Sequence, residues 1–176
     1  MSSQTEKLWD PLIRLFHWSV AAIFVANYFI NDAGDDWHQW LGYTAIFWLT
    51  IRFMWGFFGK GAALWSDFFP TRASLTAHVK SLIRGERYHR MGHSPLGGLV
   101  MILMMLCILL LGATGFMMEE INYFWGEDWV ENLHSWIADA LMALVSLHLF
   151  AALFESYRLK ENLPLSMITG KRRKIK

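Results

Sequence analysis

Four long apolar segments constrain this chain more than any other feature. They cover about residues 11–30, 37–58, 95–118 and 131–157. Each approaches the length of about 20 residues that a helix needs to cross the hydrocarbon core of a bilayer. Hydrophobic residues make up 55% of the 176 residues, above the ~45–50% usual in soluble domains. We therefore predict an all-α integral membrane protein, a four-helix transmembrane bundle in a single domain over residues 1–176.

The distribution of charge predicts how the helices are oriented. Lys and Arg are retained on the cytoplasmic side, whereas acidic residues contribute little to that choice. All 16 basic residues belong to segments that would face one side: Lys7, Arg14, Arg52, Lys60, the connection from Arg72 to Arg90, and the tail from Arg158 to Lys176. The two opposite connections, NDAGDDWHQW and EEINYFWGEDWVEN, hold eight acidic residues and no basic one. Both termini are therefore expected in the cytoplasm. Four tryptophans are expected in an outer aromatic belt: Trp37, Trp40, Trp125 and Trp129.

The connection between the second and third segments is the one long loop. Within it, about residues 71–85 have the pattern of a short amphipathic helix, with Thr71 as a suitable N-cap and Gly85 as a suitable stop. We expect this helix on the inner membrane surface. The basic tail KRRKIK is expected to meet anionic membrane lipid and to end in disorder, and no nucleic-acid partner is expected.

Two histidines interrupt the last apolar segment. His134 and His148 are 14 residues apart, so in a straight helix they share a face and lie about 21 Å apart along the axis. His134 would lie at the outer depth of the bilayer and His148 at the inner depth. His17, early in the first segment, would lie at the inner depth, and His38, at the start of the second, at the outer depth. The four histidines thus form two depth-matched pairs, His17 with His148 and His38 with His134.

Ionisable side chains inside a membrane are costly and indicate function by default. A lone transmembrane histidine also serves as an interhelical hydrogen-bonding group or an interfacial anchor, which explains His38 or His134 about as well. Chance pairing of all four is the weaker explanation. Two imidazoles on facing helices can bind one metal axially. A metal that leaves its other positions to a large apolar macrocycle is haem iron. Zinc requires a tetrahedral set that no Cys, Asp or Glu at the right depth completes. The single cysteine, Cys107, excludes an iron–sulfur site and a c-type haem attachment.

Four further residues fit haem binding, and each has an alternative. Gly98 and Gly112 are 14 residues apart on the third segment and would let a flat ring approach the backbone; small residues for close helix packing are an equal alternative. Arg52 follows His38 by 14 residues, and Arg14 precedes His17 by about one turn. Either arginine could pair with a haem propionate or extend towards the inner headgroups.

The chain resembles the bacterial di-haem cytochrome b family in four features. They are the opening WDPLIRLFHW, the histidine at the start of the second segment, the GHSPLGG entry to the third segment and the His-x13-His spacing of the fourth. This family includes the cytochrome b subunit of nickel-iron hydrogenases, the membrane subunit of formate dehydrogenases, and cytochrome b561. The resemblance covers about residues 8–158. It implies two haem b groups, a cytoplasmic-side one on His17 and His148 and a periplasmic-side one on His38 and His134. It also implies a multi-pass protein of the bacterial inner membrane and electron exchange with quinone in a respiratory chain.

Iron with two histidine ligands has no open position for oxygen or substrate, so one-electron transfer is its natural chemistry. We therefore expect an electron-transfer subunit rather than a stand-alone catalyst, with no catalytic residues. The acidic outer connections favour a basic periplasmic redox partner such as a c-type cytochrome. The alternative is a superoxide:quinone oxidoreductase of the cytochrome b561 type. The remaining histidines, His78, His89 and His93, are expected to be solvated or lipid-facing, although His93 could join a quinone site or a proton path.

Overall fold

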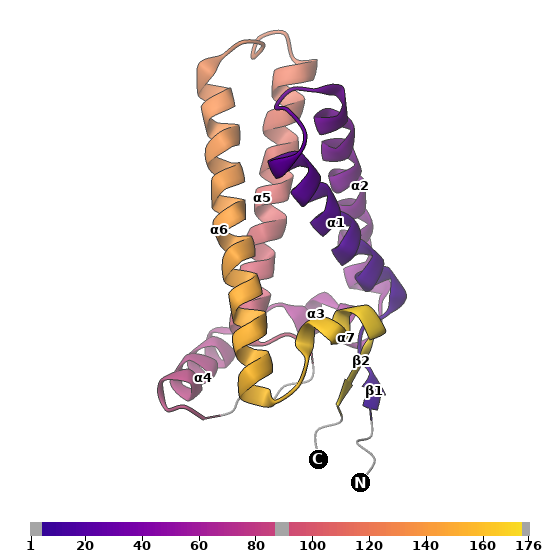
Figure 1. Ribbon diagram of the computed structural model, residues 1–176, viewed down its shortest axis with the longest axis vertical. Helices are drawn as coiled ribbons and strands as arrows, with labels where there is room; N and C mark the ends of the chain where they lie inside the picture. The colour runs from indigo at the N-terminus through magenta and orange to yellow at the C-terminus, as the bar shows by residue number, and fades with distance from the viewer. Residues whose placement is uncertain (1–4, 87–91, 174–176) are drawn as a thin grey trace. The chain divides into compact units, whose positions relative to one another are not determined.

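Four long helices dominate the computed structural model, which describes residues 5–86 and 92–173 (Figure 1). They are α1 (Pro11–Phe29), α2 (Asp36–Phe58), α5 (Pro95–Glu120) and α6 (Asp128–Leu159). All four are long and apolar enough to cross a membrane. This confirms the expected all-α membrane fold with four spanning helices. The bounds of α6 extend beyond the expected range at both ends, because Asp128 and Arg158 add favourable charges to its first and last turns.

Short elements complete the described chain. They are β1 (Thr5–Lys7), η1 (Gly61–Ala63), α3 (Trp65–Phe68), α4 (Arg72–Ile83), α7 (Leu163–Thr169) and β2 (Lys171–Arg173). The helix expected over about residues 71–85 is α4. Thr71 caps it, because its side chain accepts a hydrogen bond from the Ser74 backbone N–H while the Ser74 hydroxyl accepts one from the Thr71 N–H. Beyond the helix, Gly85 adopts a φ of 69°, which glycine tolerates best.

The chain divides into two compact units, and each long helix contributes to both. Unit 1 consists of Met1–Arg14, Met54–Ile102 and Ser146–Lys176, and unit 2 consists of Leu15–Phe53 and Leu103–Val145. Of the four histidines singled out in the sequence, His17, His38 and His134 belong to unit 2, and His148 belongs to unit 1. The two units are described separately below.

A small aromatic core organises unit 1. Trp9 and Ile13 are buried together with Ala62 and Ala63, and Trp55 and Met167 pack against them. The Trp9 indole N–H donates to the Ser166 hydroxyl at 3.1 Å, so the ring is buried without leaving its polar atom unsatisfied. The backbone N–H groups of Leu8 and Trp9 both donate to the carbonyl of Gly170. These bonds join the segment before α1 to the end of α7.

The first part of the basic tail is structured in unit 1. Strand β2 pairs antiparallel with β1, so that Arg172 lies opposite Glu6. Arg172 is buried, binds Glu161 at 3.0 Å and donates to the Gly92 carbonyl. Burial opposes ionisation of Glu161, but the Arg172 guanidinium and the Arg173 backbone N–H outweigh it and lower the pKa of this carboxyl. Residues 171–173 are therefore ordered rather than disordered as we expected, and Arg172 pairs with protein, whereas lipid contact by the exposed Lys171 and Arg173 stays a prediction. Residues 174–176 lie outside the described residues.

One contact in unit 1 yields a test of packing. A Cβ on Gly56 in α2 would overlap the indole ring of Trp65 in α3. Gly56→Ala should therefore destabilise the protein by about 1–3 kcal/mol, the usual effect of overpacking. Gly42→Ala on the same helix is the matched control, because a Cβ there meets nothing within 4 Å. Thermal unfolding in detergent measures both. Equal melting temperatures for the two variants would contradict the Gly56–Trp65 contact.

Candidate haem site

Unit 2 brings two of the predicted ligands face to face. His38 lies in the first turn of α2 and His134 near the start of α6. Their ring centroids are 6.1 Å apart, and the ring planes are inclined by 53°. A metal–imidazole bond is about 2 Å long and a ring centroid lies roughly 1 Å behind the bonding nitrogen, so two rings that share one metal have centroids about 6 Å apart. The spacing of His38 and His134 therefore fits a single metal between them.

The ring of His134 is oriented by a neighbour on α5. The Thr114 hydroxyl oxygen lies 2.8 Å from Nδ1 of His134, and Thr114 itself is only 4% exposed. The next small residue, Gly115, borders the ring, because a Cβ there would lie 3.8 Å from Cε1 of His134. Both residues come from the segment GATG, which is small and partly polar within a run of large apolar residues. We did not single out Thr114 from the sequence; a hydroxyl beside two glycines in a spanning helix is the signal that was available.

The backbone of His38 is held by a residue on α1. The Asn27 side-chain amide donates to the His38 carbonyl at 2.9 Å, and Asn31 donates to the Asn27 side-chain oxygen. The Nδ1 atom of His38 is buried and makes no hydrogen bond with the described residues. A buried imidazole nitrogen without a protein partner is costly. The buried Nδ1 atom of His38 is therefore consistent with a site that is built to hold a ligand.

His17 and His148 belong to different units, so their pairing stays a prediction. His17 lies on α1 in unit 2, where its ring contacts the edge of Trp18 with centroids 5.0 Å apart. His148 lies on α6 in unit 1 and is partly buried. The two histidines of α6 lie on one continuous helix, as their spacing requires.

The two arginines have different surroundings. Arg52 lies on the unit 2 part of α2 and is only 3% exposed, which agrees with an inward orientation. Arg14 belongs to unit 1, where its guanidinium donates to the carbonyls of Met167 and Ile168 near the end of α7. The structure thus gives Arg14 a role in joining α1 to α7. Propionate binding by either arginine stays a prediction.

The two glycines of α5 are sites of close packing within their own units. A Cβ on Gly98 would lie 2.8 Å from the Phe68 carbonyl oxygen in unit 1. A Cβ on Gly112 would overlap the Ile46 side chain in unit 2. These contacts support the packing alternative directly. A role in admitting a haem ring stays a prediction for both glycines.

His78 differs from the expectation of a solvated or lipid-facing side chain. His78 is only 3% exposed, because α4 turns His78 and Ser81 towards the rest of unit 1 and leaves Ile83 outside. Burial lowers the pKa of His78; Glu155 opposes this effect and Arg158 adds to it. His93 packs against Trp9 and Phe68, with centroids 4.6 and 5.1 Å from its own. His89 lies outside the described residues.

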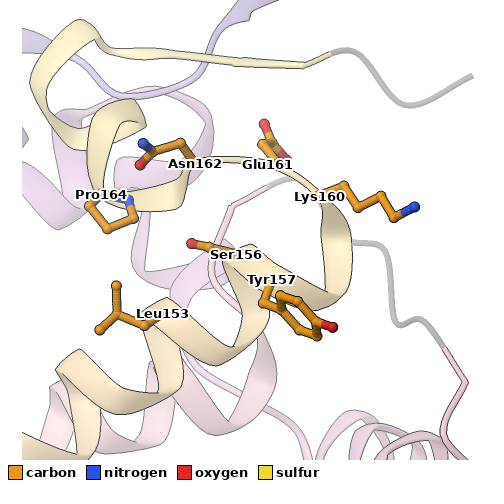
Figure 2. Close-up of a pocket in the computed structure, with 7 residues that line it drawn as sticks. All are labelled: Leu153, Ser156, Tyr157, Lys160, Glu161, Asn162 and Pro164. Atoms are coloured by element: carbon orange, nitrogen blue, oxygen red, sulfur yellow. The ribbon is translucent and has the colours of Figure 1, made fainter.

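An open pocket in unit 1 is separate from these histidines. It has a volume of about 390 Å³ and lies where α6 ends and the chain turns towards α7 (Figure 2). Its lining includes Tyr157, the exposed Lys160 and the turn residues Glu161 and Asn162. Lys160 adopts a φ of 53° just after the helix. The Glu161 carboxylate in this pocket already binds Arg172.

No group of three or more His, Cys, Asp or Glu side chains suited to a metal ion occurs among the residues that the structure describes. A metal held by His38 and His134 alone would have its other positions open to a macrocycle, as in haem iron.

Comparison with known proteins identifies the family of the chain. The family model for prokaryotic cytochrome b561 matches residues 8–170, which include all four candidate spans and the facing histidines. No curated protein and no solved structure matched the chain significantly. The chain belongs to the prokaryotic cytochrome b561 family, and it is a multi-pass bacterial membrane protein that binds haem b and serves in transmembrane electron transfer.

Proposed function

We propose that this cytochrome binds two b-type haems, one through His38 and His134 and one through His17 and His148. It would link the quinone pool to a basic redox protein in the periplasm, as an electron-transfer subunit in the bacterial inner membrane. The observation that carries the proposal is the 6.1 Å separation of the His38 and His134 rings. A haem held by two imidazoles would supply reversible one-electron chemistry and no open coordination position.

The chain's own part is to hold the ligand rings on rigid elements. His38 and His134 project from helices of 23 and 32 residues, and each is fixed by a hydrogen bond to its backbone or its ring. Ligands on regular elements are held more precisely than ligands on loops. Because the ligand positions are fixed, the site would rearrange little when a bound haem changed charge.

The acidic connections support a basic partner. The α1–α2 turn with the first residue of α2 contains three acidic residues, and the α5–α6 turn with its flanking helix ends contains five. Several large aromatic side chains are also exposed there, including Trp37, Trp125 and Tyr123. The Glu120 carboxylate accepts a hydrogen bond from Tyr43, which fixes one of these acids in place. Negative charge around an aromatic patch favours encounter with a positively charged surface.

A second candidate function is superoxide:quinone oxidoreduction. Its substrate is an anion, which a positive surface would attract. The two acidic connections contain no Lys or Arg, so charge disfavours this activity. Rapid reduction of the haem by superoxide in the purified protein would favour it over the relay.

The pairing of ligands predicts a pattern of haem loss. Replacing any one of His17, His38, His134 or His148 with Leu should remove one of two haems, because one imidazole cannot hold the iron in a six-coordinate site. The doubles His38→Leu/His134→Leu and His17→Leu/His148→Leu should still keep one haem, whereas His134→Leu/His148→Leu should keep none. Haem per folded chain, from the pyridine haemochrome spectrum, measures the outcome. Loss of both haems in a within-pair double would contradict the pairing.

Charge steering predicts salt-dependent association with a basic c-type cytochrome. The Debye length falls from about 30 Å at 0.01 M salt to about 8 Å at 0.15 M, so the association rate should fall by about tenfold or more over this range. Glu127→Gln and Glu131→Gln should lower the low-salt rate, whereas Glu6→Gln, at the N-terminal end, is the control. Stopped-flow electron exchange measures the rates. A rate that does not change with salt would contradict an acidic docking surface.

A further inference from the structure

We propose that Thr114 is a positioning residue for His134. Its hydroxyl would accept the Nδ1–H of the imidazole and so keep Nε2 as the nitrogen available to iron. This inference rests on the proposed function, because it takes His134 to be a haem ligand. It assigns a role to a residue of α5, the one long helix that contributes none of the four proposed ligands.

The contact is short and enclosed. The hydroxyl oxygen of Thr114 lies 2.8 Å from Nδ1 of His134, and the threonine is buried. The same oxygen lies 2.9 Å from the Leu110 carbonyl oxygen and 3.2 Å from that of Leu111. Hydrogen bonds at these distances are of ordinary strength. Leaving the Thr114 hydroxyl or Nδ1 of His134 unpaired inside the protein would be costly.

The Thr114 hydroxyl is able to act as an acceptor towards His134. A threonine hydroxyl has one proton to donate and two lone pairs to accept with. The carbonyls of Leu110 and Leu111 can only accept, so a hydroxyl that donates to one of them keeps a lone pair for the Nδ1–H of His134. An imidazole that binds iron through Nε2 carries its proton on Nδ1. The surroundings of Thr114 therefore suit the tautomer that iron binding requires.

The opposite ligand has no equivalent support on its ring. Nδ1 of His38 makes no hydrogen bond with the described residues, and Asn27 holds His38 only through its backbone carbonyl. Thr114 thus provides the hydrogen bond that orients a ligand ring within this pair. A partner that accepts from the second nitrogen also makes the imidazole a stronger donor to the metal, which favours the ferric form.

Three variants of the full-length protein test the role of Thr114. Thr114→Val keeps the shape and removes the hydroxyl, and Thr114→Ser keeps the hydroxyl and removes a methyl group. Thr50→Val is the matched control, because the Thr50 hydroxyl makes the same kind of bond to its i−4 carbonyl, that of Ile46, and Thr50 is exposed. Haem affinity and the two haem potentials are measured for each variant by titration.

Thr114→Val should weaken binding at one haem by about 10- to 100-fold, the usual loss when such a supporting bond is removed. One potential should become more positive, and each tenfold loss of ferric preference corresponds to about 59 mV. Thr114→Ser should restore both values, and Thr50→Val should change neither. Equal losses in Thr114→Val and Thr114→Ser, or no shift in Thr114→Val, would overturn the role of the hydroxyl. A wild-type chain without haem, or a His134→Leu variant with its full haem content, would instead refute the proposed function and the inference with it.

Discussion

The cost of placing a polar group in hydrocarbon governs this structure. A buried donor or acceptor without a partner loses its hydration and gains nothing in return. Unit 2 accordingly joins its polar side chains in pairs across helices: Thr114 with His134, Asn27 with the His38 carbonyl, Tyr28 with Asp139, and Tyr43 with Glu120. These bonds select which helix faces meet. The facing imidazoles of His38 and His134 fit the same constraint, because two partly buried rings 6.1 Å apart are placed to share one metal.

Electron transfer requires a site whose ligands stay in place, and the chain provides this with regular helices and side-chain hydrogen bonds. Two imidazoles on regular helices would hold the metal, and they would leave no open position for other ligands. Only two small polar side chains, those of Thr114 and Asn27, make the supporting hydrogen bonds that we describe. In unit 1, the Trp9 core and the Arg172–Glu161 pair hold the segment before α1 against the end of the chain.

Much of the fold could be predicted because it depends on local patterns. Apolar length defined the four spans, and Thr71 with Gly85 defined α4. The spacing of the histidines brought His38 and His134 into consideration as a pair, and the structure places them together. The β1–β2 ribbon could not be predicted, since its pairing joins residues 5–7 to 171–173 and basic tails usually stay solvated. The contact between Thr114 and His134 could not be predicted either, because the sequence does not show which residue of α6 a hydroxyl on α5 will contact.

The central claim is that one chain holds two irons, each between two imidazoles. The most direct test is electron paramagnetic resonance of the oxidised protein, combined with the amount of iron per chain. The account predicts two low-spin ferric signals of equal intensity and two irons per chain, with no high-spin signal from a five-coordinate site. A single signal with one iron per chain, or a dominant high-spin signal in the intact protein, would contradict it.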